Sequence, residues 1–240
     1  MAAVILSARG LTRHFGGLKA VDEVDLDLGA GDIHALIGPN GAGKTTFVSL
    51  LAGRIQAQAG SVTLAGRDIT RLRAHARVRA GLAYTFQITS IYPRLSVFDN
   101  AALAAQRADP PDLRAATMAA LSRTGLESRA QQVAGTLSYG HQRLLEITMG
   151  LALSPRVLIL DEPTQGLAAS EIEGFKALVR GLAPATTVLL IEHNMEVVMD
   201  LADRITVLNF GRRLATGTPA EIRADPAVQA AYLGTPHAAA

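Results

Sequence analysis

The first residues in the chain whose types and spacing suggest chemistry form a glycine-rich loop, residues 38–45, with the sequence GPNGAGKT. Its glycines let backbone N–H groups wrap around phosphate oxygens, while Lys44 can reach the β and γ phosphates of a nucleotide and the Thr45 hydroxyl can bind Mg²⁺. The loop follows a short apolar run, Ile33–Ile37, and precedes a segment with helical spacing, Lys44–Leu51. This order of strand, loop and helix favours a phosphate-binding site over a chance glycine turn.

A second candidate site lies where the apolar run 157–160 ends in two adjacent carboxylates, Asp161 and Glu162. Successive side chains of a strand point to opposite faces, so the two carboxylates cannot do the same job. By analogy with other phosphate-loop enzymes, we expect Asp161 to hold Mg²⁺ and Glu162 to polarise an attacking water. An apolar strand that ends in Asp-Glu is also common as a purely structural feature, and the glycine-rich loop upstream is what favours the catalytic interpretation.

Between these sites the sequence LSYGHQ, residues 137–142, precedes a segment with helical apolar spacing. Ser138 is well placed to begin that helix, because a serine side chain accepts a hydrogen bond from the free N–H groups of the first turn. The helix would then present N–H donors and a positive dipole end to an anion. Taken alone, the pattern is more typical of an ordinary capped helix than of a binding site.

The apolar patterns around these sites predict an α/β fold. Alternation over residues 24–28 indicates a half-buried strand in an antiparallel edge region. Farther along, short apolar runs alternate with segments of helical spacing, in the order 157–160, 169–182, 188–191, 195–201 and 205–208. Such alternation is typical of a mainly parallel sheet with helices on both faces. Residues 88–153 contain no comparable strand run, and we expect them to form a helical subdomain inserted into the core.

Composition narrows the classes of function. The 240 residues carry a formal charge of +2, from 23 basic and 21 acidic residues, so charge gives no reason to expect nucleic acid as a partner. The chain has no cysteine, which leaves oxygen or imidazole ligands for a metal. No apolar run approaches the roughly 18 to 20 residues that cross a bilayer, and the N-terminus lacks a secretory signal, so we expect a cytoplasmic location. The densest basic stretch, residues 67–79, is interpreted as a solvated helix face.

Taken in order, five motifs resemble those of the ATP-binding cassette (ABC) ATPases, and the resemblance covers nearly the whole chain: the glycine-rich loop, Phe86-Gln87, Leu137-Ser138-Tyr139-Gly140, Asp161-Glu162 and Glu192-His193. Finer features are similar to the ATPases of branched-chain amino-acid importers, namely Phe15-Gly16-Gly17-Leu18 with Ala20-Val21, LSYG in place of LSGG, Ile191-Glu192-His193-Asn194-Met195 and Ala231-Tyr232-Leu233-Gly234.

The resemblance implies an α/β P-loop NTPase core with a mainly parallel sheet, an N-terminal antiparallel β subdomain and an inserted helical subdomain. It implies a single ABC ATPase domain over residues 1–235. Within it, residues 1–87 and 154–235 would form the core with its β subdomain, and residues 88–153 the helical subdomain with the signature motif. Residues 236–240 would be a flexible tail.

The resemblance also implies a role for each matching residue. Phe15 would stack on adenine, Gln87 would sense Mg²⁺ and water while linking to the membrane subunit, and His193 would contact the γ-phosphate. The implied catalytic residues are Lys44, Gln87, Glu162 and His193, and the implied metal-site residues are Thr45, Gln87 and Asp161. The implied ATP contacts are Phe15, Gly38, Pro39, Asn40, Gly41, Ala42, Gly43, Lys44, Thr45, Thr46, Ser138 and Gly140. Of these, Ser138 and Gly140 would touch the ATP bound by a second cassette.

The implied ligands are ATP and Mg²⁺. The implied partners are a second ABC ATPase subunit, identical or paralogous, two membrane-spanning permease subunits and, indirectly, an extracytoplasmic solute-binding protein. Nucleic acid is not an implied partner. The chain would lie on the inner face of a bacterial cell membrane and power import by ATP-driven dimer closure and hydrolysis-driven opening. Branched-chain or related amino acids are the first expectation for the solute, and urea, amides and aromatic acids are alternatives. A cassette that acts on ribosomes or nucleic acid is disfavoured, because the chain has one cassette and no heptad run.

Four positions depart from the family pattern. His141 stands where related proteins usually have Gln, Thr148-Met149 replaces a common Ala-Arg, and Ala168 replaces the Asp or Asn usual after Gly166-Leu167. The last of these residues normally contacts the other cassette of the dimer. We therefore expect the fold to be unchanged. We expect the departures to affect the rate of ATP hydrolysis and the symmetry of the two ATP sites that a pair of cassettes would form.

Overall fold

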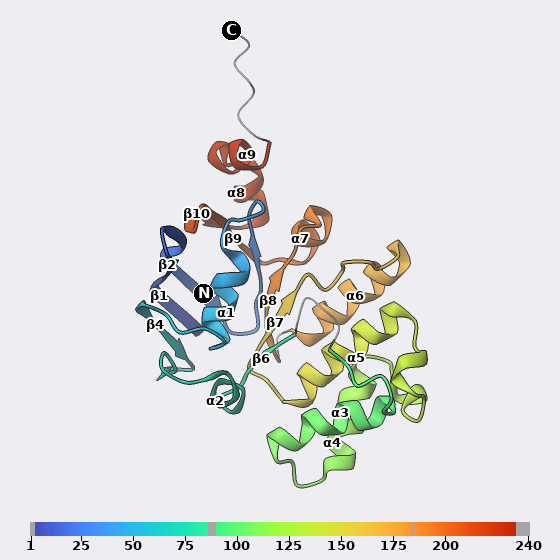
Figure 1. Cartoon of the computed structure of the whole chain (residues 1–240). Helices are drawn as coiled ribbons and strands as arrows, with labels where there is room; N and C mark the ends of the chain where they lie inside the picture. The colour runs from blue at the N-terminus through green and yellow to red at the C-terminus, as the bar shows by residue number, and fades with distance from the viewer. Residues whose placement is uncertain (1–2, 86–89, 184, 234–240) are drawn as a thin grey trace.

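The computed structural model describes residues 3–85, 90–183 and 185–233. The described strands form two sheets, one of order β2-β1-β4-β5 and one of order β10-β9-β3-β8-β7-β6. The predicted α/β class is confirmed. In Figure 1 the first sheet lies beside helix α1, the second runs through the middle of the molecule, and a group of helices forms a separate lobe below it.

The first sheet is antiparallel and consists of β1 (Val4–Phe15), β2 (Leu18–Gly29), β4 (Ala59–Leu64) and β5 (Arg67–Asp68). The predicted alternation in β2 is confirmed, since Val24, Leu26 and Leu28 are buried and Asp27 between them is exposed. The sheet thereby presents an apolar face to the core and a polar face to solvent.

The second sheet contains β3 (Ile33–Ile37), β6 (Leu82–Tyr84), β7 (Val157–Asp161), β8 (Thr187–Ile191), β9 (Arg204–Asn209) and β10 (Arg212–Gly217). Its pairs are parallel except β9 with β10. Every residue of β3, β7 and β8 is buried, as expected for parallel strands covered on both faces. The short apolar runs were therefore correctly predicted to be the central strands.

Helices cover both faces of the second sheet (Figure 1). On one face α1 (Lys44–Leu51) lies between the two sheets, where Phe47 and Leu51 pack with residues of both. On the other face α6 (Ala169–Leu182) and α7 (Met195–Leu201) pack through Phe175 and Val197 among others. The remaining α-helices of the described core are α2 (Ala74–Arg79), which precedes β6, and α8 (Pro219–Ala224) and α9 (Pro226–Leu233), which follow β10.

The predicted helical segment forms the lower lobe of Figure 1. It contains α3 (Val97–Ala105), α4 (Leu113–Arg123) and α5 (Tyr139–Ala152), joined by three 3₁₀ turns, Gln106–Ala108, Glu127–Arg129 and Ala134–Thr136. These helices enclose a core of their own that includes Val97, Leu121 and Leu145, whereas Ile147 and Leu151 of α5 pack against the main sheet. The predicted boundaries at 88 and 153 stay predictions, and the tail 236–240 lies outside the described residues.

The interpretation of residues 67–79 as a solvated helix face is wrong for Arg77. This side chain is 2% exposed, and its guanidinium donates hydrogen bonds to the carbonyls of Leu50, Leu51 and Thr70. The last carbonyls of a helix have no intrahelical partners, and a cation is favourable at that end. Arg77 therefore caps the C-terminal end of α1, while the other arginines of the stretch are exposed: Arg67, Arg71, Arg73 and Arg79.

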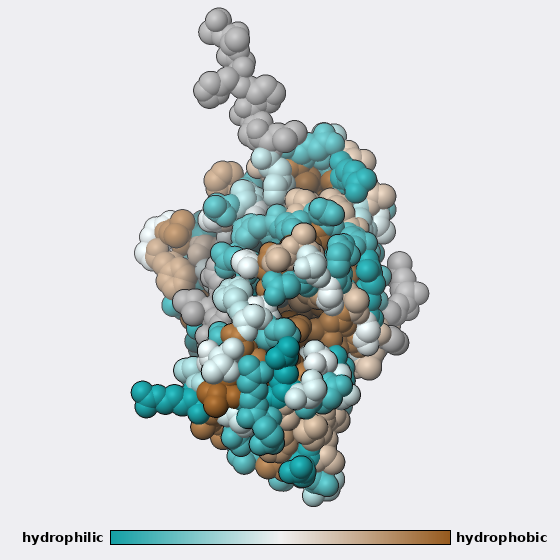
Figure 2. Space-filling model, turned by 90° about the vertical axis from the view of Figure 1, so that its right-hand side faces the viewer, coloured by the Kyte–Doolittle hydropathy of each residue, from teal (hydrophilic) through white to brown (hydrophobic). Residues whose placement is uncertain are grey.

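Among the described residues, no helix is both long and apolar enough to cross a bilayer. Figure 2 shows one face of the molecule, on which apolar groups are separated by polar side chains.

Candidate active site

The loop between β3 and α1 has the backbone that its glycines predicted. Gly38, Gly41 and Gly43 all have positive φ angles, of 153°, 78° and 95°. At Gly43 a Cβ would lie 2.1 Å from the carbonyl oxygen of Ala20, so a larger residue would clash with the neighbouring hairpin. Gly43 is also the N-cap of α1 and has no capping side chain, which leaves the first N–H groups of the helix available to an anion.

The Lys44 ammonium lies across this loop. Its Nζ donates to the carbonyl oxygens of Gly38 at 2.7 Å and Pro39 at 3.1 Å, and the residue is 7% exposed. Burial lowers the pKa of Lys44, and the charges of Glu162 and Asp161 act in the opposite direction. The loop thus fixes a cation beside its free N–H groups.

A cavity of about 300 Å³ opens over the loop. It is lined by Leu18, Ala20, Asn40, Gly41, Ala42, Gly43, Lys44, Thr45, Thr46, Glu162 and His193. Most of the residues predicted to contact phosphate therefore share one cavity with three of the predicted catalytic residues, Lys44, Glu162 and His193. The β1–β2 hairpin contributes Leu18 and Ala20, which the sequence analysis noted as family features without assigning them to the site.

Glu162 and His193 meet at this cavity. The Nε2 atom of His193 lies 2.6 Å from Oε1 of Glu162, although the residues are 31 positions apart. They follow the adjacent parallel strands β7 and β8, whose carboxyl ends reach the same edge of the sheet. Glu162 has a left-handed φ of 47°, which turns its side chain away from the direction that continued strand geometry would give. The His193 side chain is 46% exposed, so it is not a core histidine.

Asp161, in contrast, is 2% exposed and does not line the cavity. Its Oδ2 accepts a hydrogen bond of 2.6 Å from the hydroxyl of Tyr84. Burial raises the pKa of Asp161, and the Tyr84 hydrogen bond partly offsets that effect. The two adjacent carboxylates thus point in different directions, as predicted, although the left-handed backbone of Glu162 contributes to the divergence.

The donors around the loop fit Mg²⁺ better than a metal held by protein alone. Among the described residues no three or more His, Cys, Asp or Glu side chains gather as a metal site. Mg²⁺ usually binds one or two protein oxygens, several waters and the phosphates of its substrate. The Thr45 hydroxyl at the cavity and the buried Asp161 carboxylate are the two oxygen groups predicted for this role. Gln87, the third predicted metal-site residue, lies outside the described residues, as does Phe86.

Ser138 caps helix α5, as predicted. Its Oγ accepts from the backbone N–H of His141 at 3.4 Å and lies 2.7 Å from Nδ1 of the same residue. At Gly140 a Cβ would lie 2.2 Å from Oε1 of Glu171 on α6, so glycine allows the two helices to approach. Neither Ser138 nor Gly140 lines the cavity over the loop of its own chain.

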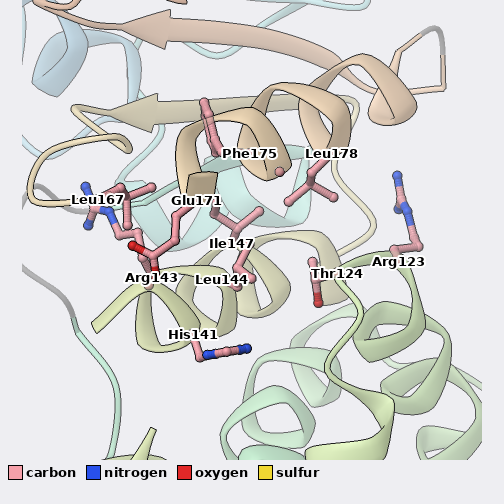
Figure 3. A pocket seen from close by; sticks show the side chains of 12 residues that line it. Arg123, Thr124, His141, Arg143, Leu144, Ile147, Leu167, Glu171, Phe175 and Leu178 are labelled. Atoms are coloured by element: carbon pink, nitrogen blue, oxygen red, sulfur yellow. The ribbon is translucent and has the colours of Figure 1, made fainter. Parts of the chain in front are cut away.

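A second cavity, of about 320 Å³, lies between α5 and α6. Figure 3 shows Leu144 and Ile147 of α5 below α6, which carries Leu178. Gly140 is the one predicted ATP contact among its lining residues. This cavity is therefore separate from the cavity over the glycine-rich loop.

Arg143 is a residue of the site that sequence reasoning missed. Its guanidinium is 2% exposed and donates to the carbonyl oxygens of Asp161 at 2.8 Å and Glu162 at 2.9 Å. It also pairs with Glu146 one turn along α5 at 2.6 Å. The helix that begins at Ser138 is thereby fastened to the backbone that carries both carboxylates. The available signal was an arginine three residues before a glutamate, Glu146, within a segment of helical apolar spacing.

Glu192 organises the loop after β8. Its Oε1 accepts from the backbone N–H of Thr164, and its Oε2 accepts from the N–H groups of His193 and Asn194 at 2.9 and 3.1 Å. The residue is 4% exposed. Glu192 therefore ties the segment that carries His193 to the segment that follows Glu162.

Phe15, predicted to stack on adenine, is half-exposed near the end of the β1–β2 hairpin. The guanidinium of Arg13 lies 4.8 Å from the centroid of its ring. Such a cation stabilises the ring electrostatically and supports its orientation. Phe15 does not line the cavity over the loop, although Leu18 of the same hairpin does.

Family models match two parts of the chain. Residues 21–165 match the family described as ABC transporter, which covers more than half of the chain. Residues 212–238 match the family described as branched-chain amino acid ATP-binding cassette transporter.

Curated proteins and solved structures are similar over nearly the full chain. The high-affinity branched-chain amino acid transport ATP-binding protein BraF of Pseudomonas aeruginosa is 40% identical, over 98% of this chain and 99% of its own length. LivG of Escherichia coli K12, described in the same words, is 38% identical over the same shares. The structure of the ADP conformation of MJ1267, an ATP-binding cassette of an ABC transporter, has a TM-score of 0.87 and 27% identity, and the match covers 97% of this chain and 100% of that chain.

Proposed function

Since this chain belongs to the ABC transporter ATPases, we propose that it is the ATP-hydrolysing subunit of an importer for branched-chain or related amino acids. The ATPase activity follows from the family. The assignment of individual residues is supported by one observation above all, the contact of Glu162 with His193 at the cavity that the glycine-rich loop forms. The solute class is supported by the match of residues 212–238 and by the similarity to BraF and LivG.

In this proposal the chain's own residues bind and orient the triphosphate. The N–H groups of residues 38 and 40–46 and the Lys44 ammonium would hold the phosphate oxygens, and the Thr45 hydroxyl and Asp161 would hold Mg²⁺. Mg²⁺, when bound, supplies positive charge at the β and γ oxygens. Glu162 orients the attacking water and polarises its O–H bond. His193 steadies the developing charge on the γ-phosphate and, through its contact with Glu162, the position of that carboxylate.

The proposal includes a second cassette. Ser138 and Gly140 lie away from the cavity over their own loop, so a partner's ATP is the one they would touch. Arg143 connects that helix N-terminus to the backbone of Glu162, and therefore connects contact with one ATP to the catalytic group acting on the other. The second cassette is a copy or a paralogue, and the pair would act on two permease subunits at the inner face of the membrane, with a solute-binding protein delivering the solute.

The solute itself does not touch this subunit, so urea, amides and aromatic acids are the alternative cargoes. The chain co-expressed with its permease subunits and solute-binding protein, reconstituted in liposomes, would distinguish them. We expect ATP-dependent uptake of labelled leucine or valine, and uptake of urea without uptake of either amino acid would contradict the proposed cargo.

The roles of the catalytic residues are tested by two variants with matched controls. Lys44→Ala should weaken binding of a fluorescent ATP analogue, because a phosphate contact is removed. Glu162→Gln should leave that affinity intact, slow hydrolysis by about 10²- to 10⁴-fold and retain ATP in a dimer. Lys19→Ala and Glu173→Gln, on exposed side chains, serve as controls. Equal losses of ATP affinity in Lys44→Ala and Glu162→Gln would contradict the assignment.

A further inference from the structure

Tyr84 has a contact that none of the predicted roles uses. It is the last residue of β6 and pairs with Ile159 of the neighbouring strand β7. Its hydroxyl lies 2.6 Å from Oδ2 of Asp161 and donates a hydrogen bond to it. The carboxylate is almost fully buried, and the tyrosine is half-buried. A short bond to an ionised acceptor in such surroundings is among the stronger protein hydrogen bonds.

The tyrosine ring is itself held in place. The guanidinium of Arg54, three residues after the end of α1, lies 5.6 Å from its ring centroid. The residue also packs against the apolar core between the two sheets. Tyr84 therefore joins the helix that begins at Lys44 to the carboxylate at the end of β7.

This arrangement decides which oxygen of Asp161 is available. The hydrogen bond occupies Oδ2 and opposes rotation of the carboxylate about its Cβ–Cγ bond. In the proposed metal site, Oδ1 would then be the oxygen that serves the shell of an ion bound at the loop. Arg143 contacts the same residue through its carbonyl oxygen. Groups that orient a metal-binding carboxylate in this way typically change metal affinity or activity by about 10- to 100-fold when removed.

We propose that Tyr84 is a positioning residue of the magnesium site, which holds the Asp161 carboxylate in the orientation that binds the metal shell. The inference rests on the proposed role of Asp161. It assigns to Tyr84 an effect on divalent-metal affinity that is separate from nucleotide affinity.

The test compares Tyr84→Phe with wild type. The substitution keeps the ring and its packing against the core, and removes the hydroxyl with its hydrogen bonds to Asp161 and Arg54. Mn²⁺ affinity is measured by electron paramagnetic resonance in the presence of the non-hydrolysable analogue AMP-PNP, and nucleotide affinity is measured separately in EDTA. We expect Tyr84→Phe to weaken Mn²⁺ binding by about 10-fold and to leave nucleotide affinity in EDTA unchanged.

Two further variants make the outcome decisive. Tyr92→Phe changes an exposed tyrosine and should behave as wild type. Asp161→Asn removes the proposed metal-site charge and should weaken Mn²⁺ binding at least as much as Tyr84→Phe. Loss of Mn²⁺ affinity in Asp161→Asn with wild-type affinity in Tyr84→Phe overturns the inference and leaves the proposed role of Asp161 standing. Wild-type affinity in both variants overturns the role of Asp161 and the inference with it. An equal loss of nucleotide affinity in EDTA would show a structural effect of Tyr84 and would also overturn the inference.

Discussion

Helix α6 begins after Ala168, a residue that cannot cap it. The backbone of Ala168, with φ −71° and ψ 159°, matches that of Thr218, with φ −69° and ψ 162°, which precedes α8. At α8 two reciprocal bonds form, from the Glu221 N–H to the Thr218 hydroxyl at 3.3 Å and from the Thr218 N–H to the Glu221 carboxylate at 2.7 Å. At α6 the second of these exists, since the Ala168 N–H donates to Glu171 at 2.9 Å. The first is missing because alanine has no acceptor.

Ala168→Thr should therefore complete the capping box and stabilise the protein. Ala168 is exposed and already has N-cap geometry, so the new side chain meets neither strain nor a filled core. A side-chain N-cap contributes about 1 kcal/mol, which raises the melting temperature of a chain of this size by about 2–4 °C. Thr218→Ala removes the corresponding bond at α8 and should lower the melting temperature by a similar amount. Thermal melts of both variants provide the measurement.

The same position bears on catalysis. The family resemblance implies an Asp or Asn at this position, with a side chain that would reach the other cassette. A hydrogen bond to a charged or buried partner contributes about 1.5 to 3 kcal/mol, so restoring it could raise turnover by roughly 10- to 100-fold. Ala168→Asn should thus raise basal phosphate release at saturating Mg-ATP, with dimerisation followed by light scattering. Ala168→Thr is the matched control, because it caps the helix with a shorter side chain.

Three results would refute parts of this reasoning. If Ala168→Thr left the melting temperature unchanged while Thr218→Ala lowered it, the missing side-chain cap at α6 would have no effect on stability. Equal gains of ATPase activity in Ala168→Thr and Ala168→Asn would assign the gain to helix stability and not to a bond across the dimer. No gain in Ala168→Asn would show that the departure at this position is neutral.

Further predictions follow from other sites. Gly174→Ala should raise the melting temperature by about 2–4 °C, because alanine favours a helix more than glycine does and its Cβ would meet nothing within 4 Å in helix α6. Gly150→Ala should raise the melting temperature less, because its Cβ would lie 3.0 Å from a leucine side chain. Equal shifts of the two variants in thermal melts would contradict this prediction. His34 is buried, which lowers its pKa from 6.5 to about 4. Between these pH values the unfolded chain binds a proton that the folded chain does not, so stability should fall by roughly 1.4 kcal/mol per unit as pH falls from 6.5 towards 4. Urea unfolding should show a flatter pH dependence for His34→Gln, and matching profiles would be the contrary result. Phe15→Ala should raise the KM for ATP far more than it lowers kcat in steady-state assays, because stacking is equal in the ground and transition states; an unchanged KM would place the adenine contact elsewhere.

The sequence by itself determined the central strands and the helices of the α/β core. Runs such as 157–160 are apolar throughout because they are buried on both faces, and that pattern is local. The helical periods of 169–182 and 195–201 coincide with the bounds of α6 and α7. The glycine-rich loop was equally visible, because its backbone conformation depends on residue types within a few positions. Strand β5 was missed, because it is two residues long and exposed. Residues 67–79 were interpreted as a helix face, and only Ala74–Arg79 forms a helix, α2.

Only the tertiary structure decided which side chains meet. Strand order is not a local property, so the sequence could not show that β7 lies between β6 and β8. That order brings Tyr84 to Asp161 and His193 to Glu162, because parallel strands end at the same edge of a sheet. The left-handed backbone of Glu162 then separates the two adjacent carboxylates. The burial of Arg77 is also tertiary, since a helix end far along the chain supplies the carbonyls that this arginine needs once it is removed from water.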